Sequence, residues 1–251
     1  MTRKTIIDCD PGQDDAVALF FAFASPEEID LLGITTVGGN VPLELTHRNA
    51  RMMCDIAAAD VPVYAGCDKP MRRSLKTAEY IHGETGIDGI DVFEPDTPLQ
   101  EQHGVDFIIE TLLAADDNSI TLVPTGPLTN IGTVIDREPG VLDKVEQIVL
   151  MGGAMREGGN RTPSAEFNIL VDPDAADIVF RCGRPIVQMG LDVTHQVLST
   201  RDRVDRILAL DNPVARATAG MIGFFERYDM SKYSAPGAPL HDPCTVCLLY
   251  T

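Results

Sequence analysis

Short apolar runs alternate with helical patterns along most of this chain. The runs KTIID, IDLLGITT, VPVYAG, SITLVP and VEQIVLM are largely apolar and lack the alternation of a half-exposed strand. Segments with helical spacing separate them, at about residues 14–24, 42–59, 105–115, 128–135 and 173–183. Strands that read as buried on both faces, with helices between them, are typical of a parallel sheet, because helical crossovers cover both of its faces.

A further strand is expected in PIVQMGLDVT, residues 185–194. The sequence has no internal repeat, no low-complexity tract and no linker, so residues 1–251 are expected to form one domain. With 44% hydrophobic residues, the chain has ample apolar material for a core. We therefore predict an α/β fold, with an open, mostly parallel, Rossmann-like sheet and helices on both faces.

Polar residues and glycines gather where the predicted strands end. These positions are Asp8, Asp10, Gly39-Asn40, Thr125-Gly126, Gly152-Gly153 and Asp192. In an open parallel sheet, ligands bind beyond the carboxyl ends of the strands, so we expect a binding site there. The irregular stretches 71–97 and 155–168 both follow strands, and we predict that they form lids over this site.

The stretch DCDPGQDD places four carboxylates within eight residues, of which Asp10 follows a strand and Asp14 and Asp15 begin a helix. Carboxylates this close repel one another unless a cation compensates them. Carboxylate oxygen is the ligand that hard cations such as Ca²⁺ and Mg²⁺ prefer, and the turn at Pro11-Gly12 lets Asp10 and Asp15 converge. The pattern therefore predicts a metal site.

The overall charge narrows the choice of partners. Thirty-eight acidic residues against 20 basic ones give a net charge of −18, which repels nucleic acid and anionic lipid. An ordinary acidic enzyme and an enzyme of a salty cytoplasm fit this composition equally well. No run is long enough to span a membrane, and no signal peptide is recognisable, so a cytoplasmic location is expected. The six cysteines are expected to be free thiols, Cys244-x-x-Cys247 included.

The motif DCDPGQDDA is similar to the N-terminal signature of the nucleoside hydrolases, the inosine-uridine-preferring nucleoside N-ribohydrolase family. Further stretches match in order: GITTVGGN, VPVYAG, IHGETGIDG, VPTGPLTNI, VLMGGA, PSAEFNILVDPDAA and HDPC. The resemblance covers the whole chain. It implies the nucleoside hydrolase fold and Ca²⁺-dependent hydrolysis of the N-glycosidic bond of ribonucleosides, giving ribose and a free base.

The resemblance also implies roles for single residues. A Ca²⁺ ion would be held by Asp10, Asp15, Asp242 and the backbone carbonyl of Thr125, with Asp10 as the general base on a water molecule. The substrate would be bound by Asp14, Asn40, His82, Asn160, Glu166, Asn168, Asp242 and the backbone at Met151. Glu166 and Asn168 flank Phe167, and in a strand that spacing would place both polar groups on one face.

Histidines and tyrosines are the candidates for handling the base. His241 precedes Asp242, and the resemblance makes it the acid that protonates the departing base. His82 lies on an expected lid and would close over the base, while Tyr228 and Tyr233 would stack on it or hydrogen-bond to it. The remaining histidines, His47, His103 and His195, are interpreted as structural or surface residues.

Two alternatives remain open at this point. A phosphatase resembling the haloacid dehalogenases also begins with D-x-D after a strand, although Gly-Thr typically follows there instead of PGQDD. The second alternative is an inactive member of the nucleoside hydrolase family that binds metal and ribose but does not turn over a substrate. The resemblance further implies a homodimer or homotetramer, and it implies C-terminal elements beyond HDPCTVCLLYT that this chain lacks.

Overall fold

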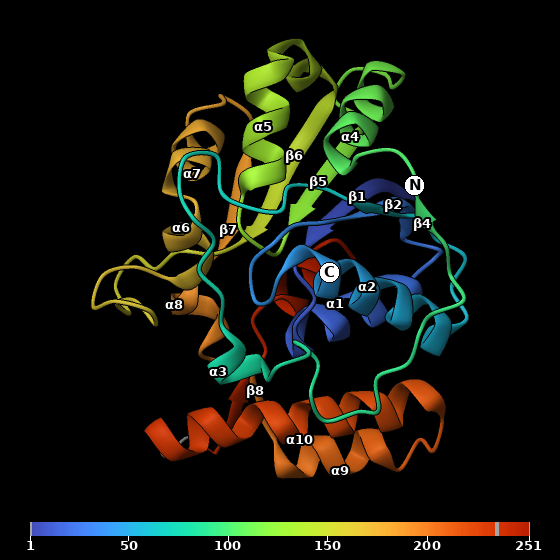
Figure 1. Ribbon diagram of the computed structural model, residues 1–251, viewed down its shortest axis with the longest axis vertical. Helices are drawn as coiled ribbons and strands as arrows, with labels where there is room; N and C mark the ends of the chain where they lie inside the picture. The colour runs from blue at the N-terminus through green and yellow to red at the C-terminus, as the bar shows by residue number, and fades with distance from the viewer. Residues whose placement is uncertain (1, 234–235, 251) are drawn as a thin grey trace.

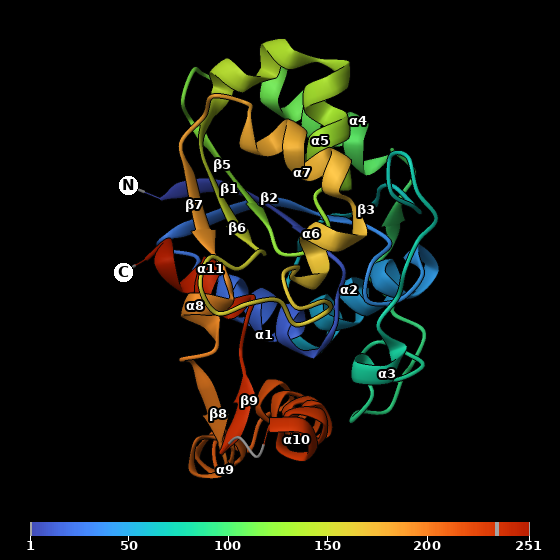
Figure 2. The same ribbon diagram turned by 90° about the vertical axis from the view of Figure 1, so that its left-hand side faces the viewer.

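The computed structural model describes residues 2–233 and 236–250. A central sheet of seven strands, in the order β4-β3-β2-β1-β5-β6-β7, dominates the molecule, and every neighbouring pair in it is parallel. A separate antiparallel pair, β8-β9, lies below the sheet near helices α9 and α10 (Figure 1; Figure 2). The predicted α/β fold with a parallel sheet is confirmed.

The strands are β1 Arg3–Cys9, β2 Ile29–Thr36, β3 Val63–Ala65, β4 Leu99–Gln100, β5 Ile120–Pro124, β6 Val145–Met151, β7 Ile186–Met189, β8 Leu198–Thr200 and β9 Gly237–Pro239. The α-helices are α1 Gln13–Phe23, α2 Leu43–Ala57, α3 Glu79–His82, α4 Gly104–Leu113, α5 Thr129–Arg137, α6 Phe167–Val171, α7 Pro173–Phe180, α8 Leu191–Thr194, α9 Arg201–Leu208, α10 Pro213–Tyr233 and α11 Pro243–Leu248. A 3-10 helix, η1, spans Pro139–Lys144.

Successive residues of β1 face opposite sides of the sheet, as the pleat requires. Ile6 packs into a cluster with residues of α4, α5 and α7, whereas Ile7 packs into a second cluster with residues of α1, α2 and α11. Both isoleucines are almost completely buried, which explains why the strand reads as a continuous apolar run. Figure 2 shows the two helical layers on opposite faces of the sheet.

Several short or weakly patterned elements were not predicted from the sequence. Strands β4, β8 and β9 have two or three residues each, too few for a periodicity to be visible. Helices α9 and α10 lie between β8 and β9 in the chain, in the 201–233 region, where no alternation of strands and helices guides the prediction. Helix α10 spans 21 residues, but no helix in the described part of the chain is long and apolar enough to cross a membrane.

The expected strand at 185–194 is only half correct. β7 ends at Met189, and Gly190 then turns the chain into the short helix α8. The carbonyl of Gly190 accepts hydrogen bonds from the amides of Val193 and Thr194, which closes the helical turn. Asp192 is therefore a residue of a helical turn beside the pocket and not the end of a strand.

Candidate active site

The carboxyl ends of the central strands meet at one edge of the sheet. Asp10 follows β1, Asn40 follows β2, Thr125 follows β5, and Met151 ends β6; all four are buried. Their proximity follows from the strand order, because β1 lies between β2 and β5, and β6 is next to β5. The topology thus brings together residues that are up to 141 positions apart in the sequence, as expected for an open parallel sheet.

Asp10 is enclosed by backbone. Its Oδ2 atom accepts a hydrogen bond of 2.7 Å from the amide of Asn40. A Cβ atom on Gly39 would overlap this oxygen, and one on Gly126 would overlap the other carboxylate oxygen. The glycines after β2 and β5 are therefore needed to leave room for the Asp10 carboxylate.

The start of α1 carries two further carboxylates, Asp14 and Asp15. Asp15 accepts hydrogen bonds from the amide of Gly12 at 3.0 Å and from the hydroxyl of Thr125 at 2.8 Å. Across from them, Asp242 precedes α11. Asp14, Asp15 and Asp242 each offer an oxygen within 4.8 Å of the other two, and all three are buried. Asp10 lies outside this group of three.

These buried like charges are electrostatically costly. Burial, followed by the charge of Asp15, raises the pKa of Asp10 well above its ordinary value and raises that of Asp14 to about 7. Burial, followed by the charge of Asp14, raises the pKa of Asp242 well above its ordinary value. Among the described residues, one oxygen each of Asp10 and Asp14 is buried without a hydrogen-bond partner. A set of anionic oxygens with unused lone pairs fits a hard divalent cation.

Glu166 and Asn168 lie at the start of α6 and not on a strand. The Glu166 carboxylate caps this helix, accepting from the amides of Asn168 and Ile169, and it also accepts from Gly153 at 2.9 Å. The Asn168 side chain donates to the carbonyl of Thr125 at 2.7 Å. The strand interpretation was wrong because an N-cap residue and the second residue of a helix can also face one site. Both side chains tie residues 152–166 to the ends of β5 and β6.

A pocket opens above the carboxylates. It encloses about 730 Å³ of non-atom space, open solvent at its mouth included. The predicted site residues that line it are Asp14, Asn40, His82, Thr125, Met151, Asn160, Glu166, Asn168, His241 and Asp242. Asp10 and Asp15 are buried and are not among the lining residues. Tyr228 also lines the pocket, whereas the side chain of Tyr233 lies outside the described residues.

Six lining residues were missed or misread in the sequence: Ala78, Tyr80, Ile81, Phe167, His195 and Phe225. Tyr80 belongs to α3 and directly precedes the motif IHGETGIDG, whereas Phe225 belongs to α10 and lies in none of the matched stretches. His195, interpreted as structural or surface, also lines the pocket, because the turn at Gly190 brings the end of α8 to the site. The other two histidines lie elsewhere: His47 is on α2, and His103 caps α4.

His241 is held from α8. Its Nδ1 atom lies 2.7 Å from the hydroxyl oxygen of Thr194, and its ring is 5.8 Å from that of His195 between centroids. Burial, with smaller contributions from His195 and His82, lowers the pKa of His241 to about 3. The ring is therefore neutral at physiological pH.

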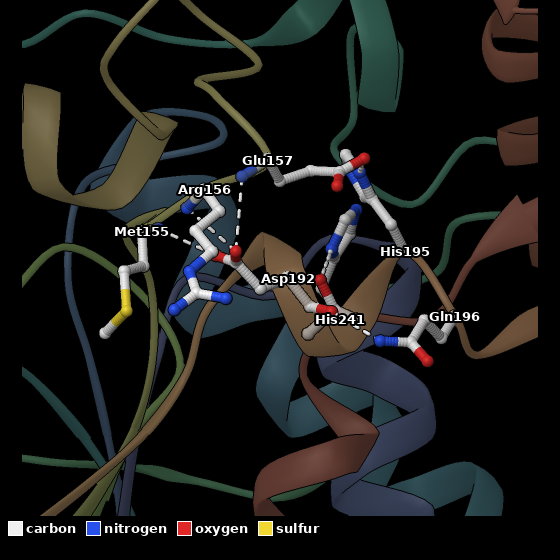
Figure 3. A network of polar contacts seen from close by, with 8 residues as sticks. Met155, Arg156, Glu157, Asp192, His195, Gln196 and His241 are labelled. Atoms are coloured by element: carbon white, nitrogen blue, oxygen red, sulfur yellow. Dashed lines mark hydrogen bonds and ion pairs between the residues drawn. The ribbon is translucent and has the colours of Figure 1, made fainter.

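The same short helix anchors residues 152–166. The Asp192 carboxylate accepts hydrogen bonds from the consecutive amides of Met155, Arg156 and Glu157, at 2.7, 2.8 and 3.2 Å (Figure 3). The Glu157 carboxylate in turn lies 3.2 Å from Nδ1 of His195. Asp192 thus connects the segment 152–166, which contains Asn160, to helix α8, which contacts His241 through Thr194.

All six cysteines are free, as expected. Cys244 and Cys247 are half-buried, and burial raises the pKa of Cys244 to about 11. Within the described residues, neither belongs to a group with the geometry of a metal site.

Comparisons with known proteins agree with one another. The model of the inosine-uridine preferring nucleoside hydrolase family matches residues 5–251. An uncharacterized protein of Schizosaccharomyces pombe is 49% identical over 247 residues, which cover 98% of this chain and 79% of that protein. The pyrimidine-specific ribonucleoside hydrolase RihA of Photobacterium profundum is 47% identical over 251 residues, 99% of this chain and 80% of that enzyme.

A solved structure gives the same match in three dimensions. The purine-preferring ribonucleoside hydrolase from Gardnerella vaginalis has a TM-score of 0.92 at 36% identity, over 98% of this chain and 79% of that one.

Proposed function

The chain belongs to the inosine-uridine preferring nucleoside hydrolase family, and we propose that it cleaves ribonucleosides with water at the carboxylate cluster described above. The observation that carries the proposal is the coincidence of the pocket with the matched motifs. Ten residues expected to bind substrate or metal or to act in catalysis, drawn from distant parts of the chain, line one cavity. The reaction breaks the bond between C1′ of ribose and the base nitrogen, and it adds a hydroxyl to C1′.

Ca²⁺ is the proposed cofactor. Asp15 and Asp242 hold it, with the Thr125 carbonyl and with Asp14 or Asp10 as further ligands. When bound, Ca²⁺ supplies a lower pKa for a water molecule and an attachment point for ribose hydroxyls. The unpartnered oxygens of Asp10 and Asp14 are the observation that supports this choice of residues.

Asp10 is proposed as the general base. Its Oδ2 atom is held by the Asn40 amide, which leaves Oδ1 to accept the proton of the attacking water. The close glycines on either side keep the carboxylate from rotating away. A fixed carboxylate also stabilises the positive charge that an oxocarbenium-like transition state develops on the sugar.

The ribose hydroxyls are proposed to bind Asp14, Asn40, Asn160, Glu166, Asn168 and the backbone at Met151. Several of these groups are already fixed by hydrogen bonds to the backbone. Glu166 accepts from three amides, and Asn160 accepts from the amide of Phe167 at 3.0 Å. Groups fixed before the substrate arrives lose little freedom on binding, which lowers the barrier to reaction.

His241 is proposed as the acid for the departing base. The base leaves with the electron pair of the broken bond, and the ring stabilises it by donating a hydrogen bond; a full proton passes to the base only when the ring has first taken one up. Because the imidazole is neutral, donation of a hydrogen bond depends on which nitrogen carries the hydrogen. With the Thr194 hydroxyl donating to Nδ1, that hydrogen is on Nε2 and available to the base.

Pyrimidine nucleosides are the proposed preferred substrates. The RihA relative at 47% identity is pyrimidine-specific, whereas the purine-preferring structure is 36% identical. Comparing kcat/KM for uridine and inosine measures the preference directly.

The test of the reaction is release of reducing sugar from uridine and inosine by the wild type and by Asp10→Ala. Ribose release that the substitution abolishes would support the proposal. Release of phosphate from phosphomonoesters instead would identify a phosphatase. Calorimetric binding of ribose without turnover of any nucleoside would identify a binding protein, and either result would contradict the proposal.

Two further properties stay predictions. Assembly into a homodimer or homotetramer is checked by light scattering after gel filtration. A cytoplasmic location is checked by fractionation of the host cells.

A further inference from the structure

Gln13 lies between Gly12 and Asp14 in the carboxylate motif DCDPGQDD. It is the first residue of α1 and is fully buried. Its amide makes three hydrogen bonds, two to His82 at the end of α3 and one to Asp88 in the loop after it. All three hydrogen bonds of this buried side chain therefore hold the segment that contains His82.

The hydrogen-bonding groups around Gln13 determine its orientation. Its nitrogen, Nε2, donates to the carbonyl of His82 at 2.9 Å and to the carbonyl of Asp88 at 3.1 Å. Carbonyls only accept, so these two partners use both N–H groups and exclude the flipped amide. The oxygen, Oε1, then faces Nδ1 of His82 at 2.7 Å. Because Oε1 only accepts, Nδ1 of His82 must carry the hydrogen.

The His82 ring cannot easily turn away from this contact. A Cβ atom on Gly12 would overlap the ring edge at Nδ1, which shows how closely the backbone packs there. On the pocket side, the ring stacks on Phe225 with centroids 5.4 Å apart and an interplanar angle of 24°. Burial lowers the pKa of His82 to about 3, so the ring carries a single hydrogen at neutral pH.

The other ring nitrogen, Nε2, is the atom left for a ligand. His82 lines the pocket, and within the described residues no side chain hydrogen-bonds to this nitrogen. A neutral imidazole with hydrogen on Nδ1 has a lone pair on Nε2 and is an acceptor there. His82 therefore presents an acceptor, whereas His241 is proposed to present a donor.

We propose that Gln13 is a positioning residue that fixes His82 in the tautomer with hydrogen on Nδ1, so that Nε2 accepts a hydrogen bond from an N–H or O–H group of the nucleoside. The first half concerns the protein alone, and the second half rests on the proposed function. The group that donates is either the ring N–H of a base such as uracil or the 5′-hydroxyl of ribose. Cytosine, which has a lone pair where uracil has N3–H, would oppose the acceptor.

The tautomer is read directly from a two-bond ¹H–¹⁵N correlation spectrum of protein labelled with ¹⁵N-histidine. In the wild type, the spectrum of His82, assigned through its contacts to Phe225, is expected to show a protonated Nδ1 and an unprotonated Nε2. Hydrogen on Nε2 in the wild type would overturn the proposal. This measurement needs neither a variant nor any substrate.

Gln13→Met keeps the length of the side chain and removes its hydrogen bonds. An Nδ1–H buried against the thioether would lack an acceptor, so the hydrogen is expected to move to Nε2 in this variant. Gln102→Met, at a half-buried glutamine outside the pocket, is the matched control and should leave the His82 spectrum unchanged. An unchanged His82 spectrum in Gln13→Met would mean that Gln13 does not select the tautomer.

Kinetics identify the substrate group. We compare kcat/KM for uridine with that for 3-methyluridine, which lacks N3–H, and for 5′-deoxyuridine, which lacks the 5′-hydroxyl. In the wild type, loss of the donating group should lower kcat/KM by on the order of tenfold, the cost of one neutral hydrogen bond. In Gln13→Met, kcat/KM for uridine should already be lower by this factor. The analogue that lacks the donating group should then have about the same kcat/KM as uridine.

If the methyl group of 3-methyluridine lowers kcat/KM only by a steric clash, the loss should also occur in Gln13→Met. Comparing the wild type with this variant therefore separates a steric effect from loss of the hydrogen bond. Equal losses for both analogues in the wild type and in Gln13→Met would contradict the proposed acceptor. Failure of the wild type to hydrolyse uridine and inosine would defeat the proposed function instead. The tautomer measurement would then still decide the role of Gln13.

Discussion

The floor and the wall of the pocket differ in how the chain holds them. The carboxylate floor consists of Asp10, Asp14, Asp15 and Asp242. The pocket wall consists of residues 71–97, residues 152–166 and helix α10. Each floor residue has at most 5% of its surface exposed, whereas Tyr80 in the wall has 52% exposed.

The floor is fixed by the sheet and by helix starts. Asp10 continues directly from a central strand, and the capping contact between Asp15 and the Gly12 amide fixes the first turn of α1. The wall, in contrast, is held by scattered side-chain contacts such as those of Gln13 and Asp192. We infer that the floor sets the reaction, while the wall sets which base is accepted and how well the site closes. This division is tested below from the largest expected effect to the smallest.

The largest effect is expected at the floor. Asp10→Asn keeps the shape of the side chain but removes the base, so kcat for uridine should fall by roughly 10³–10⁴-fold. Circular dichroism should be unchanged, because the asparagine fits the same space between Gly39 and Gly126. A loss of less than tenfold would show that Asp10 does not take the proton.

His241→Ala should have a smaller effect that depends on the leaving group. Loss of the acid should lower kcat for uridine by about 10²-fold. A riboside of p-nitrophenol leaves as a stable anion without protonation, so its kcat should hardly change. Equal losses for both substrates would contradict the acid role and indicate that His241 only shapes the pocket.

Asp242→Asn should change stability with a sign that depends on Ca²⁺. Without a cation, removal of one buried like charge should raise Tm by about 5 °C, because the Asp14 charge and burial both disfavour ionised Asp242. With Ca²⁺, the wild type should be the more stable protein, since the variant has lost a ligand. Differential scanning calorimetry with chelator and with Ca²⁺ measures both.

Asp136→Asn, on the exposed face of α5, is the matched control for this experiment. It should shift Tm little and equally in both conditions. If Asp242→Asn behaves in the same way, the floor is not a cation site.

Asp192→Asn tests the wall and should have the smallest effect. Weaker hydrogen bonds to the amides of Met155 and Arg156 should raise KM for uridine by about three- to tenfold and leave kcat nearly unchanged. Asp202→Asn on α9 is the control, exposed and outside the pocket. A fall in kcat as large as that of Asp10→Asn would contradict the division between floor and wall.

The same anchor predicts a pH dependence. Backbone hydrogen bonds from Met155 and Arg156 lower the pKa of Asp192 below its ordinary value. The anchor is therefore complete above the ordinary pKa and is lost as the pH falls through the lowered one. Amide exchange at Met155 and Arg156 should accelerate only in that acidic range, and Asp192→Asn should abolish the dependence.

The floor was predictable from the sequence, whereas the wall was predictable only at the residues of matched motifs, such as His82 and Asn160, for a physical reason. Asp10, Asp14 and Asp15 belong to one local motif, and the residues around it follow strands whose apolar pattern is plain. Tyr80, Phe225 and His195 reach the pocket only through tertiary packing of short or weakly patterned elements. The incorrect strand prediction for 185–194 shows the same limit, because a single turn at Gly190 brings His195 to the pocket.

The measurement that tests the account most directly is turnover of uridine as Ca²⁺ is added back to chelator-treated wild type. We expect kcat to rise from near zero and to saturate over the same Ca²⁺ concentrations that raise Tm. That result would place catalysis and cation binding at one set of carboxylates. Full turnover after complete removal of Ca²⁺ would contradict the central claim.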